Sequence, residues 1–294
     1  MDRPTILLTG AGGQVGFELA RSLARHGEVT ATDRAALDLA DADAIVAAVR
    51  QLRPRLIVNA GAYTAVDLAE TEREAAFAVN ARAPGILADE AKRLDAVLIH
   101  YSTDYVFDGL STTPYAEDAP ANPLNVYGES KYQGERAVAQ SGACALVFRT
   151  GWVYGARGRN FLLTILRLAR ERDELRIVAD QHGTPNWCRT LSDAATAVVA
   201  RGLPWLAERA GLYHVTSSGE TTWHGFAQAI VDQSPGPRPR VVPIPSSAYP
   251  TPARRPAYGV LSSRKFETTF GYVLPDWRSG LATCRSGMLA GPGG

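Results

Sequence analysis

Short apolar runs alternate with alanine-rich helical stretches over the first half of this 294-residue chain. Five runs have the length and composition of strands: TILLTG, EVTATD, RLIVNAGA, AVLIHYSTDYVF and ALVFRTGWVYG. RLIVNAGA and AVLIHYSTDYVF lack polar alternation at their centres, which is typical of strands buried on both faces of a parallel sheet. Strands that alternate with helices predict a doubly wound α/β fold.

The helical stretches between these runs span 14–27, 41–54, 72–94 and a segment that contains Tyr127. After residue 150 the alternation loosens, and further helices are expected at 160–172, 190–203 and 222–233, followed by a proline-rich segment and a last short helix. We therefore expect one domain over residues 1–150. A smaller lobe over 151–294 would be interleaved with it across a soft boundary.

Composition narrows the class of function. The net charge is +1 and no long basic run is present, so we expect neither a nucleic-acid nor a membrane-surface role. The apolar run near the N-terminus is too short for a signal peptide or a membrane span. The three cysteines, Cys144, Cys188 and Cys284, are widely spaced and odd in number, so no disulfide framework or zinc site is expected. A cytoplasmic protein fits these features.

A glycine-rich loop follows the first strand and opens the first helix, with Gly10, Gly13 and Gly16 at intervals of three residues and Gly12 between them. Glycines allow the tight turn and let the backbone approach a pyrophosphate at the helix N-terminus. A glycine-rich strand–helix turn without a ligand would show the same pattern. Asp33 ends the second strand, where an acidic group hydrogen-bonds an adenosine ribose, and this favours a dinucleotide site.

The stretch PLNVYGESKYQGERAV places Tyr127 and Lys131 four residues apart, on one face of a helix. A free tyrosine has a pKa of about 10. A nearby ammonium favours the phenolate, so we expect Lys131 to lower the pKa of Tyr127 and make it an acid–base group. Lys131 could also hold the nicotinamide ribose hydroxyls. The alternative is an amphipathic helix with a half-buried tyrosine and a solvated lysine.

Two glycines, Gly128 and Gly134, interrupt this helix, and each costs about 1 kcal/mol relative to alanine. We expect Gly128 to leave room for cofactor or sugar beside Tyr127. Gly134 would let a neighbouring element pack closely.

Hydroxyl side chains should complete the site at the carboxyl ends of the strands, where ligands bind in such sheets. Thr9, Asn59, Thr103 and Thr150 all fall at such ends. Spacing alone does not choose between Ser102 and Thr103 as the partner of Tyr127.

Several motifs together resemble the dTDP-4-dehydrorhamnose reductase family of the extended short-chain dehydrogenase/reductase superfamily. They are TGAGGQVGFEL, VNAGAYTAVDLAE, HYSTDYVFDG, PLNVYGESKYQGE, FRTGWVYG, DQHGTP, GLYHV, TTWHGFA and SAYPTPARRP. The similarity runs from the first strand to about residue 277. It implies a Rossmann-like NAD(P)-binding domain followed by a substrate-binding lobe. It also implies NADPH or NADH as cofactor, and Thr103, Tyr127 and Lys131 as the catalytic trio.

The resemblance and the charge pattern give the remaining site residues. By resemblance, Asp104, Tyr105 and Trp152 join Thr103 in touching a dTDP-sugar. The positive charges of Arg254 and Arg255 make them candidate contacts for its diphosphate. Arg34 could receive the 2′-phosphate of NADPH, so we expect both cofactors to be used. The expected cofactor-binding residues are Gly10, Gly13, Gln14, Val15, Gly16, Asp33, Arg34, Asp38, Leu39, Ala62, Tyr63, Thr64, Tyr101, Tyr127 and Lys131.

The activity that the resemblance implies is reduction of the C4 keto group of dTDP-4-dehydro-6-deoxy-L-mannose to dTDP-L-rhamnose. Three alternatives stay open at this point. They are a related 4-ketoreductase for another deoxysugar of a secondary-metabolite pathway, a nucleotide-sugar epimerase or dehydratase, and a non-catalytic regulatory homologue.

Some members of the family hold Mg²⁺ at a dimer interface with acidic side chains of the first and last helices. Glu18 occupies the first-helix position, but no carboxylate follows Asp276 in this chain. Because Mg²⁺ is usually bound through one or two carboxylates, we expect no metal site and no metal-bridged dimer. The oligomeric state is otherwise open.

Overall fold

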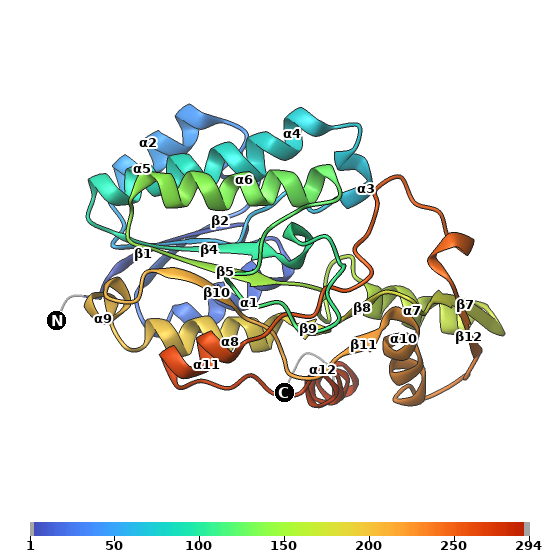
Figure 1. The fold of residues 1–294 in the computed structure, drawn as a ribbon. Helices are drawn as coiled ribbons and strands as arrows, with labels where there is room; N and C mark the ends of the chain where they lie inside the picture. Colours follow the sequence, from blue (N-terminus) through green and yellow to red (C-terminus); the bar gives the residue numbers. More distant parts are fainter. Residues whose placement is uncertain (1–2, 291–294) are drawn as a thin grey trace.

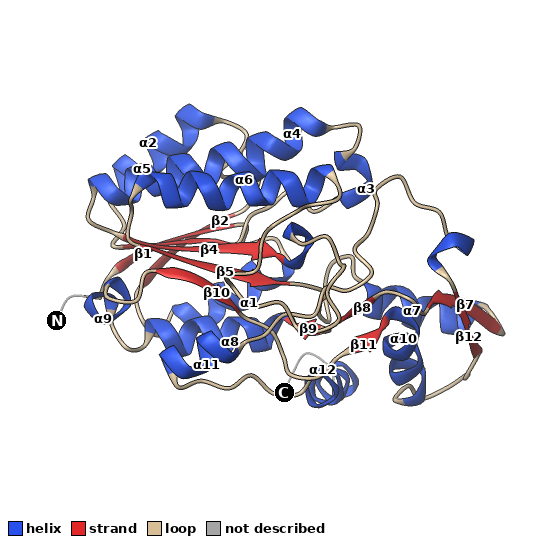
Figure 2. Cartoon of the chain, viewed as in Figure 1, coloured by secondary structure: helices blue, strands red, loops and turns tan. Residues whose placement is uncertain are grey.

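The computed structural model describes residues 3–290, and six of its strands form one parallel sheet (Figures 1 and 2). The strand order is β10-β5-β4-β3-β1-β2, and every pairing in it is parallel. The carboxyl ends of these strands therefore meet at one edge of the sheet. The doubly wound α/β fold is confirmed. The strands are β1 (Thr5–Thr9), β2 (Glu28–Thr32), β3 (Leu56–Asn59), β4 (Val97–Thr103), β5 (Ala145–Thr150) and β10 (Gly211–His214).

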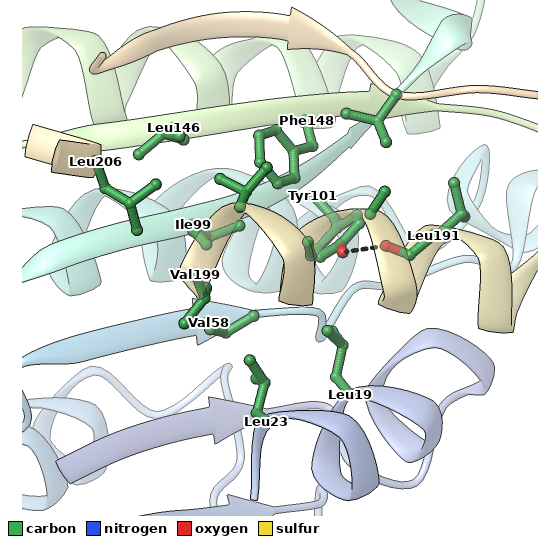
Figure 3. Packing of buried hydrophobic residues seen from close by; sticks show 14 of the residues in the cluster. Leu19, Leu23, Val58, Ile99, Tyr101, Leu146, Phe148, Leu191, Val199 and Leu206 are labelled. Carbon is green, nitrogen blue, oxygen red and sulfur yellow. Dashed lines mark hydrogen bonds between the residues drawn. The ribbon is translucent and has the colours of Figure 1, made fainter. Parts of the chain in front are cut away.

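Helices cover both faces of the sheet (Figure 1). One face carries α2 (Ala42–Leu52), α5 (Ala83–Arg93) and α6 (Val126–Ser141), and the other carries α1 (Gln14–Leu23), α8 (Cys188–Val199) and α11 (Arg264–Phe270). A separate apolar core fills the space on each side. Figure 3 shows one of them, in which leucines of α1 and α8 pack against side chains of β3, β4 and β5.

The smaller lobe lies beyond the carboxyl edge of the sheet and has its own apolar core around Phe226 and Trp277. Its helices are α7 (Phe161–Glu171), α10 (Trp223–Asp232) and α12 (Trp277–Ala290). Its strands form three pairs: β6 (Val153–Tyr154) with β9 (Asn186–Trp187), β7 (Glu174–Val178) with β12 (Arg240–Ile244), and β8 (His182–Gly183) with β11 (Thr221–Thr222). Short elements complete the chain: α3 (Val66–Ala69), α4 (Arg73–Phe77), α9 (Leu203–Ala207) and the 3₁₀ turns η2 (Asp104–Val106) and η3 (Ser246–Ala248).

The chain returns to the central sheet after residue 150. Helix α8 packs against α1, and β10 adds a strand beside β5. The division into two parts at residue 150, and their interleaving, stay predictions. Within residues 3–290, no helix is both long and apolar enough to cross a membrane.

The stretch 72–94, expected to be helical, changes its hydrogen-bonding pattern along its length. It consists of α4, a π-helical turn η1 (Ala78–Arg82) and α5. Proline has no N–H, so Pro84 cannot donate the α-helical bond to the carbonyl of Asn80, four residues earlier. The expected helical stretch is confirmed, and this proline explains why its hydrogen-bond ladder changes at the start of α5.

The two glycines of α6 make room for backbone and not for a ligand. A Cβ on Gly128 would lie 2.2 Å from the carbonyl oxygen of Tyr105, and one on Gly134 would lie 2.1 Å from that of Asn80. The expectation that Gly128 leaves space for cofactor or sugar is therefore wrong, since η2 already fills that space. The expectation that Gly134 allows close packing is confirmed. Gly134 thus approaches the Asn80 carbonyl, which receives no α-helical hydrogen bond because Pro84 has no N–H.

This packing predicts that Gly134→Ala destabilises the protein, although alanine favours a helix. The clash of a new Cβ with fixed backbone should outweigh the propensity gain, so the free energy of unfolding should fall by about 2 kcal/mol. Urea unfolding measures this. The control is Gly287→Ala on α12, where a Cβ would meet nothing within 4 Å. That variant should gain up to about 1 kcal/mol. Equal effects at the two positions would contradict the account.

Candidate active site

The glycine loop forms the floor of the site at the end of β1. Gly10 has a φ of +74°, and its carbonyl accepts the N–H of Gly13 at 2.9 Å. A Cβ on Gly10 would lie 2.4 Å from the backbone of Gly61, and one on Gly16 would lie 2.1 Å from the Gly10 carbonyl. Helix α1 begins after Gly13 with no side-chain cap and no acidic residue in its first turn. Its free N–H groups and positive dipole end suit a pyrophosphate.

The expected adenosine residues line the edge beside this loop. Asp33 lies near the loop, since a Cβ on Gly12 would be 3.5 Å from the Cβ of Asp33. One oxygen of the Asp33 carboxylate accepts the N–H groups of Ala35 and Ala36, each at 3.0 Å. Arg34 is exposed, with its Nε 3.7 Å from an Asp38 oxygen. A carboxylate and an exposed guanidinium, the latter paired with Asp38, therefore lie side by side at this position.

Five further expected cofactor residues lie near the glycine loop or in the loop that follows β3. The side chain of Leu39 lies against Gly61. The buried Asn80 accepts the backbone N–H of Tyr63 at 2.9 Å and donates to its carbonyl at 3.0 Å. The π-helical turn thus orients the loop that contains Ala62, Tyr63 and Thr64. Gln14 at the start of α1 accepts a hydrogen bond from Asn160 at 2.9 Å.

Thr103 ends β4 beside the start of α6, which contains Tyr127 and, one turn later, Lys131. Asn125 caps α6 by accepting the N–H of Gly128 at 2.8 Å, which sets Tyr127 in the first turn. The Thr103 hydroxyl is close enough to Tyr127 to influence its pKa, and it donates to Asp104 at 3.0 Å. Ser102, the other candidate, donates to Glu135 and is thereby occupied.

Lys131 is 2% exposed, and its Nζ donates to the carbonyl oxygen of Tyr101 at 2.6 Å. Burial lowers the pKa of Lys131 to about 8, and the carboxylate of Glu135 opposes this shift. The Tyr101 ring faces the opposite side of the sheet, in the core, with its hydroxyl on the Leu191 carbonyl at 3.5 Å (Figure 3). Only the backbone of Tyr101 is therefore turned toward Lys131.

The pKa of Tyr127 is raised to about 12, chiefly by burial and further by Asp104, while the Thr103 hydrogen bond opposes the rise. The expectation that Lys131 lowers this pKa is wrong for the ligand-free chain. Desolvation of this half-buried phenol dominates, and the Lys131 amine is bound to the Tyr101 carbonyl. A phenol with this pKa is protonated at neutral pH, as a proton donor must be.

The expected sugar residues face the same edge. Asp104 is buried between Gly151 and Gly259; one of its oxygens has no hydrogen-bond partner, and burial raises its pKa to about 7. The ring of Tyr105 packs edge-on against Tyr127, with 5.7 Å between centroids. Trp152 has a φ of +46°, which a bulky side chain adopts only when its surroundings hold it there.

The stacking partner of Trp152 is Trp223 of α10, and it was not anticipated from the sequence. The two indoles are parallel with centroids 3.5 Å apart. Trp223 comes from the smaller lobe, so this stack joins the lobe to the site. No local sequence pattern predicts contact between two residues that are 71 positions apart. The sequence indicated Trp223 only as part of the motif TTWHGFA.

The two arginines expected at the diphosphate differ in placement. Arg255 makes two hydrogen bonds of 2.9 Å to the carboxylate of Asp67 on α3. Arg254 is exposed, and its carbonyl accepts from Asn125 at 2.7 Å. The segment around both residues is thereby tied to the first domain. The Asp67 carboxylate thus offsets part of the positive charge that Arg255 would offer to a diphosphate.

Glu18 pairs with Arg189 at 3.1 Å. Within residues 3–290, no group of three or more His, Cys, Asp and Glu side chains has a metal-binding arrangement.

Comparison with known proteins places the whole chain among reductases of one kind. The family described as RmlD substrate binding domain matches residues 4–289. The chain is 50% identical to a dTDP-4-dehydrorhamnose reductase of Burkholderia thailandensis, over 97% of this chain and 99% of that protein. It is 43% identical to the enzyme of the same name from Escherichia coli, over 94% and 95%.

Solved structures agree. A dTDP-4-dehydrorhamnose reductase from Clostridium acetobutylicum superposes with a TM-score of 0.91 at 33% identity, covering 97% of this chain and 99% of that one. The Bacillus anthracis enzyme in complex with NADP gives 0.89 at 32%, with the same coverage. A UDP-glucose 4-epimerase from Thermus thermophilus, 20% identical with a TM-score of 0.81, shares the fold.

The buried amine of Lys131 predicts a pH-dependent contribution to stability. Its pKa is about 8 in the folded chain against 10.5 ordinarily, so between these values the unfolded chain binds more protons and stability rises with pH. The cost of burying the charged amine is complete below pH 8 and is lost by pH 10.5. Relative to Lys131→Met, the wild type should gain about 2 kcal/mol between pH 7 and 10.

Urea unfolding of both proteins at the two pH values measures this difference, and tyrosine titration cancels in the comparison. Lys265→Met, at an exposed lysine, controls for the substitution itself. A difference between wild type and Lys131→Met that does not change with pH would contradict the burial of this amine.

Proposed function

The chain belongs to the RmlD family of dTDP-4-dehydrorhamnose reductases, and we propose that it reduces the C4 keto group of dTDP-4-dehydro-6-deoxy-L-mannose to give dTDP-L-rhamnose. One observation carries the proposal. A protonated phenol, Tyr127, lies beside the Thr103 hydroxyl at the carboxyl end of β4, at the same edge of the sheet as the uncapped N-terminus of α1.

NADPH or NADH supplies the hydride when bound. The residues present suit such a cofactor, because the glycine loop has no side chains where a pyrophosphate would approach and α1 offers free N–H groups there. Asp33 would accept the adenosine ribose hydroxyls, and Arg34 would pair with a 2′-phosphate. Lys131 would donate to the nicotinamide ribose.

The proton comes from Tyr127. Its hydroxyl would donate to the keto oxygen as negative charge develops there, and Thr103 would supply a second hydrogen bond to the same oxygen. Donors directed at charge that appears only in the transition state raise the rate more than the affinity. A phenol with a pKa of about 12 keeps its proton until this charge develops.

Lys131 would then stabilise the phenolate that remains. Its pKa of about 8 leaves it mostly charged at pH 7. The stacked indoles of Trp152 and Trp223 offer a flat apolar surface to the sugar nucleotide, while Asp104 presents an oxygen without a partner. These contacts would orient the keto carbon with respect to Tyr127.

Turnover of dTDP-4-dehydro-6-deoxy-L-mannose with NADPH, followed by absorbance and by NMR of the product, tests the proposed reaction. Formation of dTDP-L-rhamnose with one equivalent of NADPH consumed is expected. Another C4 epimer would indicate a 4-ketoreductase for a different deoxysugar. Protein that purifies with NAD and interconverts sugars without net reduction would indicate an epimerase.

Removing the Tyr127 hydroxyl should abolish most of this activity. For Tyr127→Phe we expect kcat to fall by about 10²–10⁴-fold, the usual worth of a general acid, with sugar-nucleotide binding retained. Tyr132→Phe is the matched control, since Tyr132 lies on the same helix and packs in an apolar cluster around Phe107. Near-wild-type turnover in Tyr127→Phe would reject the assignment of the proton donor.

A further inference from the structure

Three buried polar side chains form a hydrogen-bonded row across the neighbouring strands β1, β3 and β4. The Thr9 hydroxyl of β1 lies 2.7 Å from Oδ1 of Asn59 at the end of β3. The Nδ2 of Asn59 lies 3.1 Å from Nδ1 of His100 in β4. All three residues are at most 1% exposed. Polar groups at such burial are costly unless they are partnered, so the row requires an explanation beyond packing.

The row ends at the catalytic lysine. The other ring nitrogen of His100, Nε2, is 3.5 Å from Nζ of Lys131, whose amine also donates to Tyr101. Burial and the positive charge of Lys131 lower the pKa of His100 well below its ordinary value, so the ring is neutral. A neutral imidazole has one N–H and one acceptor nitrogen, and the partner of Nδ1 decides which of them faces Lys131.

Asn59 can set this choice in either sense. When its amide N–H donates to Nδ1, the Nε2–H of His100 points at Lys131 and suits a neutral amine. When the amide turns over, its oxygen accepts the Nδ1–H and Nε2 accepts from an ammonium. The Thr9 hydroxyl can accept or donate and so serves both arrangements. The second is the stronger, because a hydrogen bond from a charged donor is about twice as strong as a neutral one.

We propose that His100, oriented by Asn59 and Thr9, is a positioning residue that accepts a hydrogen bond from the Lys131 ammonium and holds it in place for Tyr127 and the cofactor ribose. The row ends in buried groups and does not reach solvent, so it orients the amine and does not conduct protons. The role given to Lys131 rests on the proposed function, whereas the link from His100 to Lys131 can be tested without it.

The other charged groups around Lys131 leave this role to His100. On its own helix, Glu135 is bound to Arg149 of β5 through two hydrogen bonds of 2.6 and 2.8 Å, and Ser102 also donates to it. Tyr127, one turn earlier, is neutral at physiological pH. Glu135 thus acts on the lysine through its charge, and His100 offers it a side-chain acceptor.

The test uses two substitutions that differ in reach. A glutamine side chain places its amide near the position of Nε2, and an asparagine near that of Nδ1. His100→Gln can therefore still accept from Lys131, whereas His100→Asn can contact only Asn59. A purely structural role would make the two polar variants behave alike.

The first readout is the titration of Lys131 itself in cofactor-free protein. The chain has three lysines, Lys92, Lys131 and Lys265, so ¹³C,¹⁵N-lysine NMR resolves each and Lys131→Met assigns the signal. Loss of an acceptor for the charged form should lower the Lys131 pKa by at least about 0.5 in His100→Asn. His100→Gln should stay close to the wild type. Lys92 and Lys265 are internal references.

The second readout is turnover of the sugar nucleotide. Misplacement of the amine should reduce kcat by about 10-fold or more in His100→Asn, with recovery of at least about a third of wild-type kcat in His100→Gln. The same Lys131 pKa in wild type and both variants would overturn the inference. If His100→Asn does not fold, His100→Phe keeps a planar ring without nitrogens and carries the same expectation. If the Lys131 pKa changes in the variants as expected but the wild type does not turn over the sugar nucleotide, only the proposed function is contradicted.

Discussion

The hydrogen bond from the buried Lys131 amine to the Tyr101 carbonyl is the contact on which the rest of the site depends. An amine this deeply buried is stable only when it is partnered. Its partner carbonyl belongs to the residue of β4 that directly precedes Ser102 and Thr103. The bond therefore fixes α6 along the strand. Once α6 is fixed, Tyr127 one turn earlier must lie beside Thr103, and a phenol and a hydroxyl converge on one point at the carboxyl edge of the sheet.

Close backbone contacts make this placement of α6 possible. Gly128 allows the helix to touch the Tyr105 carbonyl, and Gly134 allows it to touch the carbonyl of Asn80. The side chain of Asn80 in turn holds the backbone of Tyr63 in the loop after β3. Helix α6, the turn η2 and the loop after β3 are thus joined by direct contacts. The desolvation costs of Lys131 and Asp104 fall in the same region, as is common where activity needs groups in partly buried positions.

The alternation of strands and helices was sufficient to predict five of the six strands and the doubly wound parallel sheet, and the glycine loop with Asp33 indicated the carboxyl edge of that sheet as the expected cofactor site. Other features depend on contacts that no local pattern encodes. Strand β10 and the π-helical turn before α5 were missed. The π-helical turn has a single cause, Pro84, which cannot donate to the carbonyl of Asn80 four residues earlier. The pair of Arg255 with Asp67 joins positions 188 residues apart. The direction of the Tyr127 pKa shift depends on burial. His100 left a weak signal, as a polar residue inside the apolar run AVLIHYSTDYVF.

The central claim is that this chain reduces a C4 ketone in a dTDP-sugar, with Tyr127 as the proton donor. Isotope transfer tests the reduction most directly. The enzyme would be incubated with dTDP-4-dehydro-6-deoxy-L-mannose and NADPH that has deuterium at both positions of the nicotinamide C4, and the product would be examined by NMR. The account predicts dTDP-L-rhamnose with deuterium at C4 of the sugar, formed by the wild type and hardly at all by Tyr127→Phe. A sugar product without deuterium at C4, or equal label transfer by the two proteins, would contradict it.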